Sequence, residues 1–213
     1  GDQLLEAKLT DGSCDVMMAV KSGRAIRFSE EKVRATGRGA IGVAGIEVDD
    51  ENDEVIGMIC VSKKAEIIPN VLVVSEKGYG KRTAVDEYRF TNRGGKGVKT
   101  MNVTDKTGKL VGLLDVLDNE DLLITCKSGI TIRMPVNGIS ELGRATQGVK
   151  LIRVDEGDAI AAITTVDEQE EVEEVTEVTE VVGENTDASV QDQPEEDGTA
   201  ATDEETDSTE PEE

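Results

Sequence analysis

Short apolar runs rich in Val and Ile recur along the first 166 residues and are separated by turn residues and charges. β-branched runs of roughly 4–8 residues are typical of strands, whereas helices need longer stretches with a 3.6-residue period. Glycine turns such as KSGR, EKGYGK and KSGI lie next to several runs and indicate hairpins. The pattern therefore predicts an all-β fold.

An eleven-residue pattern occurs three times, with an apolar first residue, Arg at the sixth position and Gly-Val at the end. The copies, called here the first, second and third segments, are Val33–Val43, Tyr88–Val98 and Ile139–Val149. Turn glycines upstream of the segments are spaced by 55 and 51 residues, and so are the glycines of the three Gly-Val pairs. A fixed period of this length indicates a repeat architecture with three units.

Each unit is expected to hold four short strands, which is the size of a propeller blade. The expected strands are 16–20, 25–28, 45–48 and 55–61, then 71–74, 82–85, 98–103 and 110–116, then 122–126, 130–134, 149–154 and 159–166. Blades bury one another's faces, so we expect a propeller-like fold of about three four-stranded blades over residues 1–166. Three blades are too few for a ring, and residues 1–9 resemble the end of a unit at 156–164. We therefore expect the C-terminal piece of a longer repeat protein.

The composition changes after Val166. The chain has a formal net charge of −23, yet every Lys and Arg lies at or before Arg153. Valines three apart in EQEEVEEVTEVTEVV would suit a weak helix, but high negative charge without aromatic residues favours disorder. We expect a near-neutral body followed by a disordered acidic tail over residues 167–213.

The three cysteines show no ligand spacing, and Cys60 and Cys126 are expected to be buried, reduced thiols, which suits a cytoplasmic protein. No apolar run approaches the ~20 residues of a membrane helix, so no membrane partner is expected. The first residues, GDQLLEAKL, lack the features of a signal peptide.

Several catalytic chemistries find no support in the sequence. The chain has no His, which excludes Ser-His-Asp triads and histidine metal sites. GRGAIG at 37–42 echoes a nucleotide loop but opens no predicted helix. DDENDE at 49–54 lacks the glycine of a calcium loop and recurs in phase as the turns TDKTGK and DEGD. We expect no catalytic residue, metal site or cofactor in this chain.

Basic residues are concentrated in one phase of the repeat. The windows 21–38, 77–99 and 127–153 hold six, seven and five bases against two, two and one acids. Because a repeat fold turns a sequence phase into a position in space, we expect a basic rim. Lys and Arg neutralise phosphates, and no aromatics interleave for stacking on single strands. No helix carries the bases into a major groove, which leaves sequence-tolerant binding of bent double-stranded DNA.

The expected DNA contacts are drawn from these windows. Arg38, Arg93, Lys96 and Arg144 are expected to matter most, and the supporting residues are Arg24, Arg27, Lys81, Arg82, Lys99 and Lys150. One alternative is a propeller-like protein-interaction scaffold in which these are ordinary solvated charges. Another is an enzyme acting on a small molecule or carbohydrate, which the lack of His and Trp disfavours.

GYGKRTAVDEY at 78–88, VRATGRGAIGV at 33–43, GRATQGVKLIRV at 143–154 and the acidic C-terminus resemble the C-terminal domain of the bacterial DNA gyrase A subunit. The resemblance covers nearly all of residues 1–166. It implies a β-pinwheel, a propeller-like disc in which neighbouring blades exchange strands, typically with six blades. It also implies DNA wrapping around a basic rim, within an ATP-dependent type II topoisomerase that negatively supercoils DNA. The topoisomerase IV A subunit is the competing paralogue.

The resemblance further implies partners: the remainder of gyrase A and the gyrase B subunit in an A2B2 heterotetramer, associated with the nucleoid. ATP and magnesium are used elsewhere in that assembly. The family's catalytic tyrosine lies in another domain, and Tyr79 and Tyr88 match blade positions. The family's basic heptapeptide, QRRGGKG, normally marks the first blade. Residues 91–97, TNRGGKG, match it at five positions and are interpreted as a blade-loop version of the same phosphate contact.

The acidic tail has two interpretations. A tethered polyanion competes with DNA for the basic rim at a high effective concentration. The other interpretation is a solubilising appendage.

Overall fold

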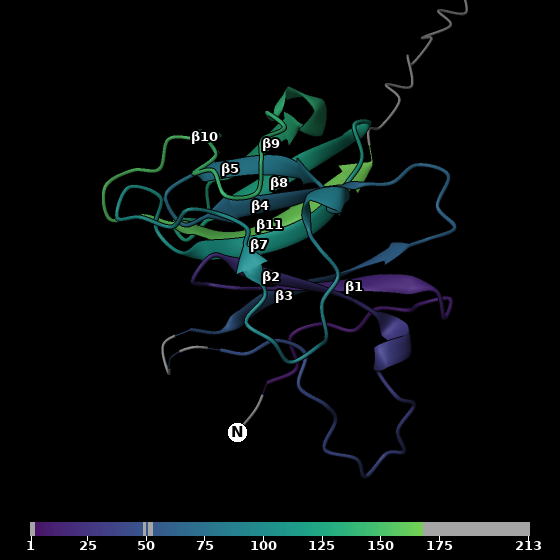
Figure 1. The fold of residues 1–213 in the computed structure, drawn as a ribbon. Helices are drawn as coiled ribbons and strands as arrows, with labels where there is room; N and C mark the ends of the chain where they lie inside the picture. The colour runs from purple at the N-terminus through teal and green to yellow at the C-terminus, as the bar shows by residue number, and fades with distance from the viewer. Residues whose placement is uncertain (1–2, 49, 51–52, 168–213) are drawn as a thin grey trace, which may run out of the picture. The chain divides into compact units, whose positions relative to one another are not determined.

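The computed structural model describes residues 3–48, 50 and 53–167, and these form three antiparallel β-sheets (Figure 1). The first sheet has the order β3 (Val55–Ser62), β1 (Cys14–Val20), β2 (Arg24–Ser29), β6 (Val98–Lys99). The second has the order β10 (Val149–Lys150), β5 (Tyr79–Ala84), β4 (Asn70–Ser75), β7 (Leu110–Val116). The third has the order β11 (Ile160–Asp167), β8 (Glu120–Cys126), β9 (Thr131–Pro135). The all-β prediction is confirmed.

The three predicted glycine hairpins are present and join β1 to β2, β4 to β5, and β8 to β9. Their glycines have φ angles of 89° at Gly23, 82° at Gly78 and 90° at Gly129. A side chain at such an angle is strained, so glycine is required at the turn. A single 3-10 turn follows the second strand of each hairpin, at Glu30–Lys32, Val85–Glu87 and Val136–Gly138.

Neighbouring units exchange a strand. β6 comes from the second unit but pairs with β2 of the first, through Arg24↔Lys99 and Ala25↔Val98. In the same way β10 comes from the third unit and pairs with β5 of the second, through Val149↔Gly80. The strand exchange that the resemblance implies is therefore present twice.

The third strand of each unit differs from its prediction. Residues 45–48 form only an isolated bridge, Ile46↔Gly95, and the expected strands 98–103 and 149–154 shorten to two residues each. The chain bends after these short strands, because Met101 and Ile152 turn inward and their N–H groups donate to the turn carbonyls of Gly23 and Gly78. β5 also begins at Tyr79, three residues earlier than expected.

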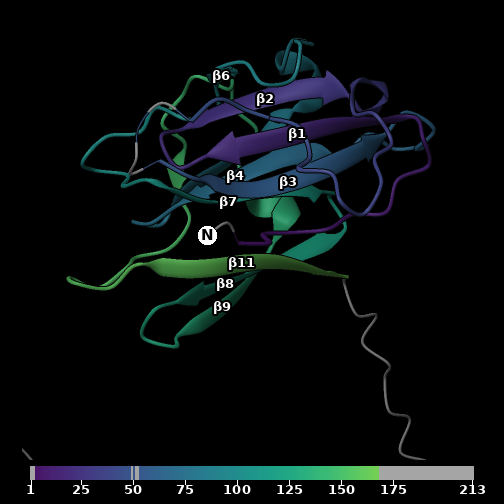
Figure 2. The same ribbon diagram turned by 90° about the horizontal axis from the view of Figure 1, so that it is seen from below.

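The core lies between the sheets (Figure 2). β4 alternates its side chains, so Val71 and Val73 pack toward the first sheet while Leu72 and Val74 pack toward the third. All four are fully buried, so the second sheet is covered on both faces. A further cluster lies on the opposite face of the first sheet, beside residues 30–46, and includes Val16, Ile26 and Phe28. Burying these faces is the main source of stability in a stack of repeats.

The predicted acidic tail lies outside the described residues, apart from Asp167, which ends β11. Among the described residues no helix is long and apolar enough to cross a membrane.

Candidate nucleic-acid interface

The second and third segments each cross the sheet of the preceding unit. In the second segment Thr91 donates its N–H to the carbonyl of Arg27 at 2.9 Å. In the third segment Leu142 donates its N–H to the carbonyl of Arg82, also at 2.9 Å. Arg27 and Arg82 occupy the same position of the repeat, so the two contacts are equivalent.

The glycine of each Gly-Val pair is needed where the segment crosses. A Cβ added at Gly97 would lie 2.3 Å from the carbonyl oxygen of Ala25, and one at Gly148 would lie 2.7 Å from that of Gly80. Real Cβ atoms do not come that close to backbone, and both glycines also have positive φ angles. The repeated Gly-Val therefore marks the point at which one unit's backbone lies directly on the next.

The arginine at the sixth position links each segment to the one before it. Arg93 donates Nη1 to the carbonyl of Ala44 at 3.1 Å, and Arg144 donates Nη1 to the carbonyl of Lys99 at 3.0 Å. Ala44 and Lys99 are equivalent, because each follows Gly-Val in its segment. Backbone bonds from Glu47 to Gly95 and from Asn102 to Thr146 repeat in phase as well. The three segments consequently lie in series.

Seven of the ten predicted contact residues are accessible on or beside these segments. Arg38, Lys96, Lys99 and Lys150 are exposed, and Arg24, Arg93 and Arg144 are half-buried. Lys99 and Lys150 occupy equivalent places at the ends of β6 and β10.

The expected set omitted two further basic residues of the segments, Arg34 and Arg89. Both occupy the second position of a segment, and both are exposed. Their shared phase in the repeat was the available signal.

Arg27 and Arg82 lie in the interior, where they hold two units together. Nη2 of Arg27 lies 2.7 Å from Asp15 Oδ2, and its Nη1 donates to the carbonyl of Val85 in the next unit at 2.8 Å. Arg82 donates Nε to the carbonyl of Ile139 at 2.8 Å and pairs with Asp118. Their relative exposures are only 9% and 8%, so this structure places both guanidinium groups away from the accessible rim.

Lys81 is also interior. Its ammonium group donates to the carbonyls of Gly143 and Arg144, each at 2.6 Å, and to the hydroxyl of Thr146 at 3.0 Å. Burial lowers the pKa of Lys81 to about 8. The side chain fixes the turn of the third segment that carries Arg144, so it acts by positioning that turn.

Tyr88, the first residue of the second segment, is fully buried, and its hydroxyl lies 2.5 Å from Thr100 Oγ1. Burial raises the pKa of this phenol. Tyr88 therefore packs inside the blade at the start of the second segment.

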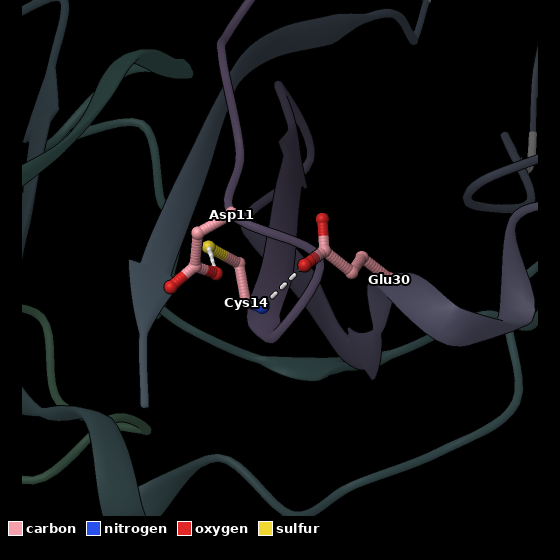
Figure 3. Close-up of side chains that lie close together, drawn as sticks. All are labelled: Asp11, Cys14 and Glu30. Carbon is pink, nitrogen blue, oxygen red and sulfur yellow. Dashed lines mark hydrogen bonds between the residues drawn. The ribbon is translucent and has the colours of Figure 1, made fainter. Parts of the chain in front are cut away.

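Asp11, Cys14 and Glu30 form a second cluster of potential ligands at the start of β1 (Figure 3). Asp11 already accepts hydrogen bonds from the N–H and hydroxyl of Ser13, which lower the pKa of Asp11. Glu30 accepts the N–H of Cys14 at 2.6 Å, and burial raises the pKa of the Cys14 thiol. A metal ligand would need the thiolate, so the cluster is better suited to closing a turn than to holding a metal.

The model for the family "DNA gyrase C-terminal domain, beta-propeller" matches this chain three times, over residues 15–62, 69–116 and 120–167. This chain belongs to that family. Each gyrase repeat begins with the first strand of a hairpin, β1, β4 or β8, and ends with β3, β7 or β11.

Two kinds of relatives support the assignment. The DNA gyrase A subunit of Staphylococcus epidermidis is 42% identical over 162 residues, which cover 76% of this chain and 18% of the relative. The chain thus spans less than a fifth of that relative's length. A solved DNA gyrase A C-terminal domain is 28% identical with a TM-score of 0.64, covering 72% of this chain and 50% of that one. The C-terminal domain of DNA topoisomerase IV shares the fold, with 20% identity, a TM-score of 0.69, and coverage of 76% and 49%.

Proposed function

We propose that this chain is the DNA-binding and DNA-wrapping part of the A subunit of a DNA gyrase. The observation that carries the proposal is the repeated bond from the sixth-position arginine to the preceding segment, which Arg93 and Arg144 both make. It sets the segments in series, so that cations in the same phase follow one path across successive units.

The chemistry along that path suits a phosphate backbone. Arg34 and Arg89 share one phase, Lys99 and Lys150 share another, and all four are exposed. Cations of this kind release counterions from duplex DNA and carry no sequence information. Such a path favours sequence-tolerant binding to a bent duplex, in which added contacts offset the energy of deforming the DNA.

The sixth-position arginines contribute indirectly as well as by charge. Arg93 donates Nε to the carbonyl of Lys32 at 3.0 Å in addition to its bond to Ala44, so two of its donors are already engaged with backbone. We assign Arg93 and Arg144 a positioning role in the interface, and the outward-facing lysines the larger share of phosphate contact.

The wider setting follows from the family. We propose that the chain acts within a type II topoisomerase, with the remainder of gyrase A and gyrase B in an A2B2 heterotetramer that introduces negative supercoils. ATP hydrolysis and magnesium belong to other parts of that assembly. Association with the nucleoid follows from the proposed DNA partner.

Electrophoretic mobility shift with duplex DNA tests the proposal. The variant Lys99→Glu with Lys150→Glu is expected to bind at least about tenfold more weakly at low salt, with a salt dependence reduced by about two phosphate contacts. The matched control, Lys8→Glu with Lys64→Glu, makes the same change in net charge outside the segments and is expected to bind as the unchanged protein does.

Equal affinity of the two double variants would contradict the proposal. An unchanged protein with no duplex binding at low salt would favour the protein-interaction scaffold. Supercoiling by the complete enzyme, with this region present or deleted, then tests the wrapping role.

A further inference from the structure

The three sheets present unlike surfaces to the unit that follows them. The trailing face of a sheet is the face that carries the positions equivalent to Met17, Ala19 and Ile59 of the first sheet. In the first sheet it packs on the second sheet. Register places Ile59, Leu114 and Thr164 opposite Met17, Leu72 and Leu123 in the three sheets. In the first and second sheets this face is buried against the next unit except at Leu114, which is partly buried.

Three threonines stand on the trailing face of the third sheet where the other sheets have apolar residues or glycine, whereas Leu123 keeps the apolar character of Met17 and Leu72. Where the first two sheets have the fully buried Ala19 and Val74, the third has Thr125. Where they have Ile59 and Leu114, the third has the exposed Thr164. The hydroxyls of Thr125 and Thr131 lie 3.2 Å apart and satisfy each other without another unit. Burying these hydroxyls against an apolar neighbour is unfavourable.

The third sheet also differs at the position where a strand from the next unit crosses the first two sheets. The first two sheets have Ala25 and Gly80 there, and a Cβ added at Gly80 would lie 2.5 Å from Leu151 Cδ1 of the incoming chain. The third sheet has Thr131, a larger β-branched residue, which is exposed. A segment built like the second or third one would meet the side chain of Thr131 at this position.

The hairpin turns of the first two sheets receive the backbone of the next unit. A Cβ added at Gly23 or Gly78 would lie 2.7 or 2.4 Å from the carbonyl oxygen of Met101 or Ile152, respectively. The arginine of the third sheet, Arg133, has a side chain 46% exposed, and its Nε donates to Asp121 within the same sheet at 2.6 Å.

The opposite end of the stack is apolar. The outward face of the first sheet carries Val16, Phe28 and Met58, and these line a cavity of about 560 Å³ together with residues of the first segment. Ile41 of that segment is fully exposed. The stack thus has one face suited to another blade and one face that resembles the polar end cap of a repeat array.

From this asymmetry we propose that the third sheet terminates the array of blades in the complete subunit. No further blade packs on its trailing face, so the ring stays open at this point. The inference does not depend on DNA binding, because it concerns contacts between blades only.

Thiol labelling of the full-length subunit, without DNA, tests this inference. Cysteines are introduced one at a time by Thr125→Cys and Thr164→Cys on the trailing face of the third sheet. The matched control is Val74→Cys, at the fully buried position of the second sheet that is equivalent to Thr125. Labelling by a maleimide is located by mass spectrometry, which separates the new sites from native cysteines.

The third-sheet cysteines are expected to label within about tenfold of their rate in urea, whereas Val74→Cys labels at least about a hundredfold more slowly than in urea. Protection of both third-sheet sites to the level of Val74→Cys would overturn the proposal. If the sites are protected, repeating the labelling after truncation at Asp167 shows whether the tail or another blade protects them.

A second measurement avoids the thiols. Thr164→Glu is expected to leave the melting temperature within about 1 °C, and a loss of several degrees would contradict an open end.

Discussion

Arg27 shows why the formal charge of a residue in a basic window does not reveal its role. Its guanidinium group is buried between Asp15 and two carbonyls of the next unit, and it lies 4.2 Å from the ring centroid of Phe90. Arginine suits this place because its planar group holds several donors in a fixed arrangement. The residue therefore stabilises the junction between two blades.

Replacing Arg27 should destabilise the fold strongly. Arg27→Leu leaves Asp15, which is 3% exposed, with only the partly exposed ammonium of Lys63 at 3.4 Å, and we expect a loss of about 3 kcal/mol in the free energy of unfolding measured with urea. Arg27→Leu with Asp15→Leu is expected to recover part of that loss, because no charge then stays buried alone. An Arg27→Leu protein as stable as the original would contradict this role.

Lys81 leads to a prediction about pH. Its pKa of about 8 lies below the usual value of 10.5, so between these two values the unfolded chain binds more protons than the folded one. The Lys81 contribution to stability therefore rises as pH increases from about 8 to about 10.5 and is smallest below pH 8. Lys81→Ile introduces the residue found at the equivalent positions Ile26 and Ile132, and it lacks this dependence.

The measurement is the difference in unfolding free energy between the original protein and Lys81→Ile across this range. We expect it to shift in favour of the original protein as pH rises. A constant difference would contradict the lowered pKa, and so would a carbon-13 NMR titration that places the Lys81 amine near 10.5.

The roles of these interior cations were beyond the reach of the sequence. Lys81 and Arg82 are adjacent in a strand and point to opposite faces, which usually exposes one of them. Both are buried because the third segment covers the edge of β5, and that cover comes from residues about sixty positions away. Arg34 and Arg89, in contrast, were recognisable from their phase in the repeat.

At the scale of the elements, the close backbone approach at the Gly-Val pairs predicts a large stability cost for adding a side chain there. Gly97→Ala places a Cβ 2.3 Å from the carbonyl oxygen of Ala25 at a φ of +69°, so we expect a loss of roughly 2–3 kcal/mol in the free energy of unfolding. Gly42→Ala is the matched control, because Gly42 has a φ of +89° with nothing within 4 Å. It is expected to cost only the backbone strain, about 1 kcal/mol. Equal losses in the two variants would contradict the close approach at Gly97.

Most strands were predictable because their apolar runs and glycine turns are local signals. β4, β7 and β8 were each predicted within one or two residues. The short strands β6 and β10 were predicted too long, because their ends are set by pairing with another unit and by the inward turn of Met101 and Ile152. Local patterns contain no information about which sheet a strand joins.

At the scale of the whole molecule, the charge of −23 conceals a body with nearly equal numbers of acids and bases. The tail, which lies outside the described residues, supplies almost all of the excess negative charge. Deleting residues 168–213 is expected to tighten duplex binding at low salt, because a tethered polyanion no longer competes for the cations. The gain should shrink as salt rises, since screening weakens both interactions.

A tail of the same length with its Glu and Asp changed to Gln and Asn is the control for the deletion. It should bind duplex as tightly as the truncated form. If all three forms have the same affinity throughout a salt titration, the tail serves solubility alone.

The strand exchange between units has a consequence for how such a protein changes during evolution. The repeat in the sequence does not coincide with one sheet of the structure. The two are offset because β6 and β10 each complete the sheet of the preceding unit. Duplicating or deleting a whole period keeps every sheet intact, since an equivalent short strand arrives from whichever copy comes next. Recombination at any other spacing would leave a sheet without its outer member, so blade number can vary among descendants while the junctions stay fixed.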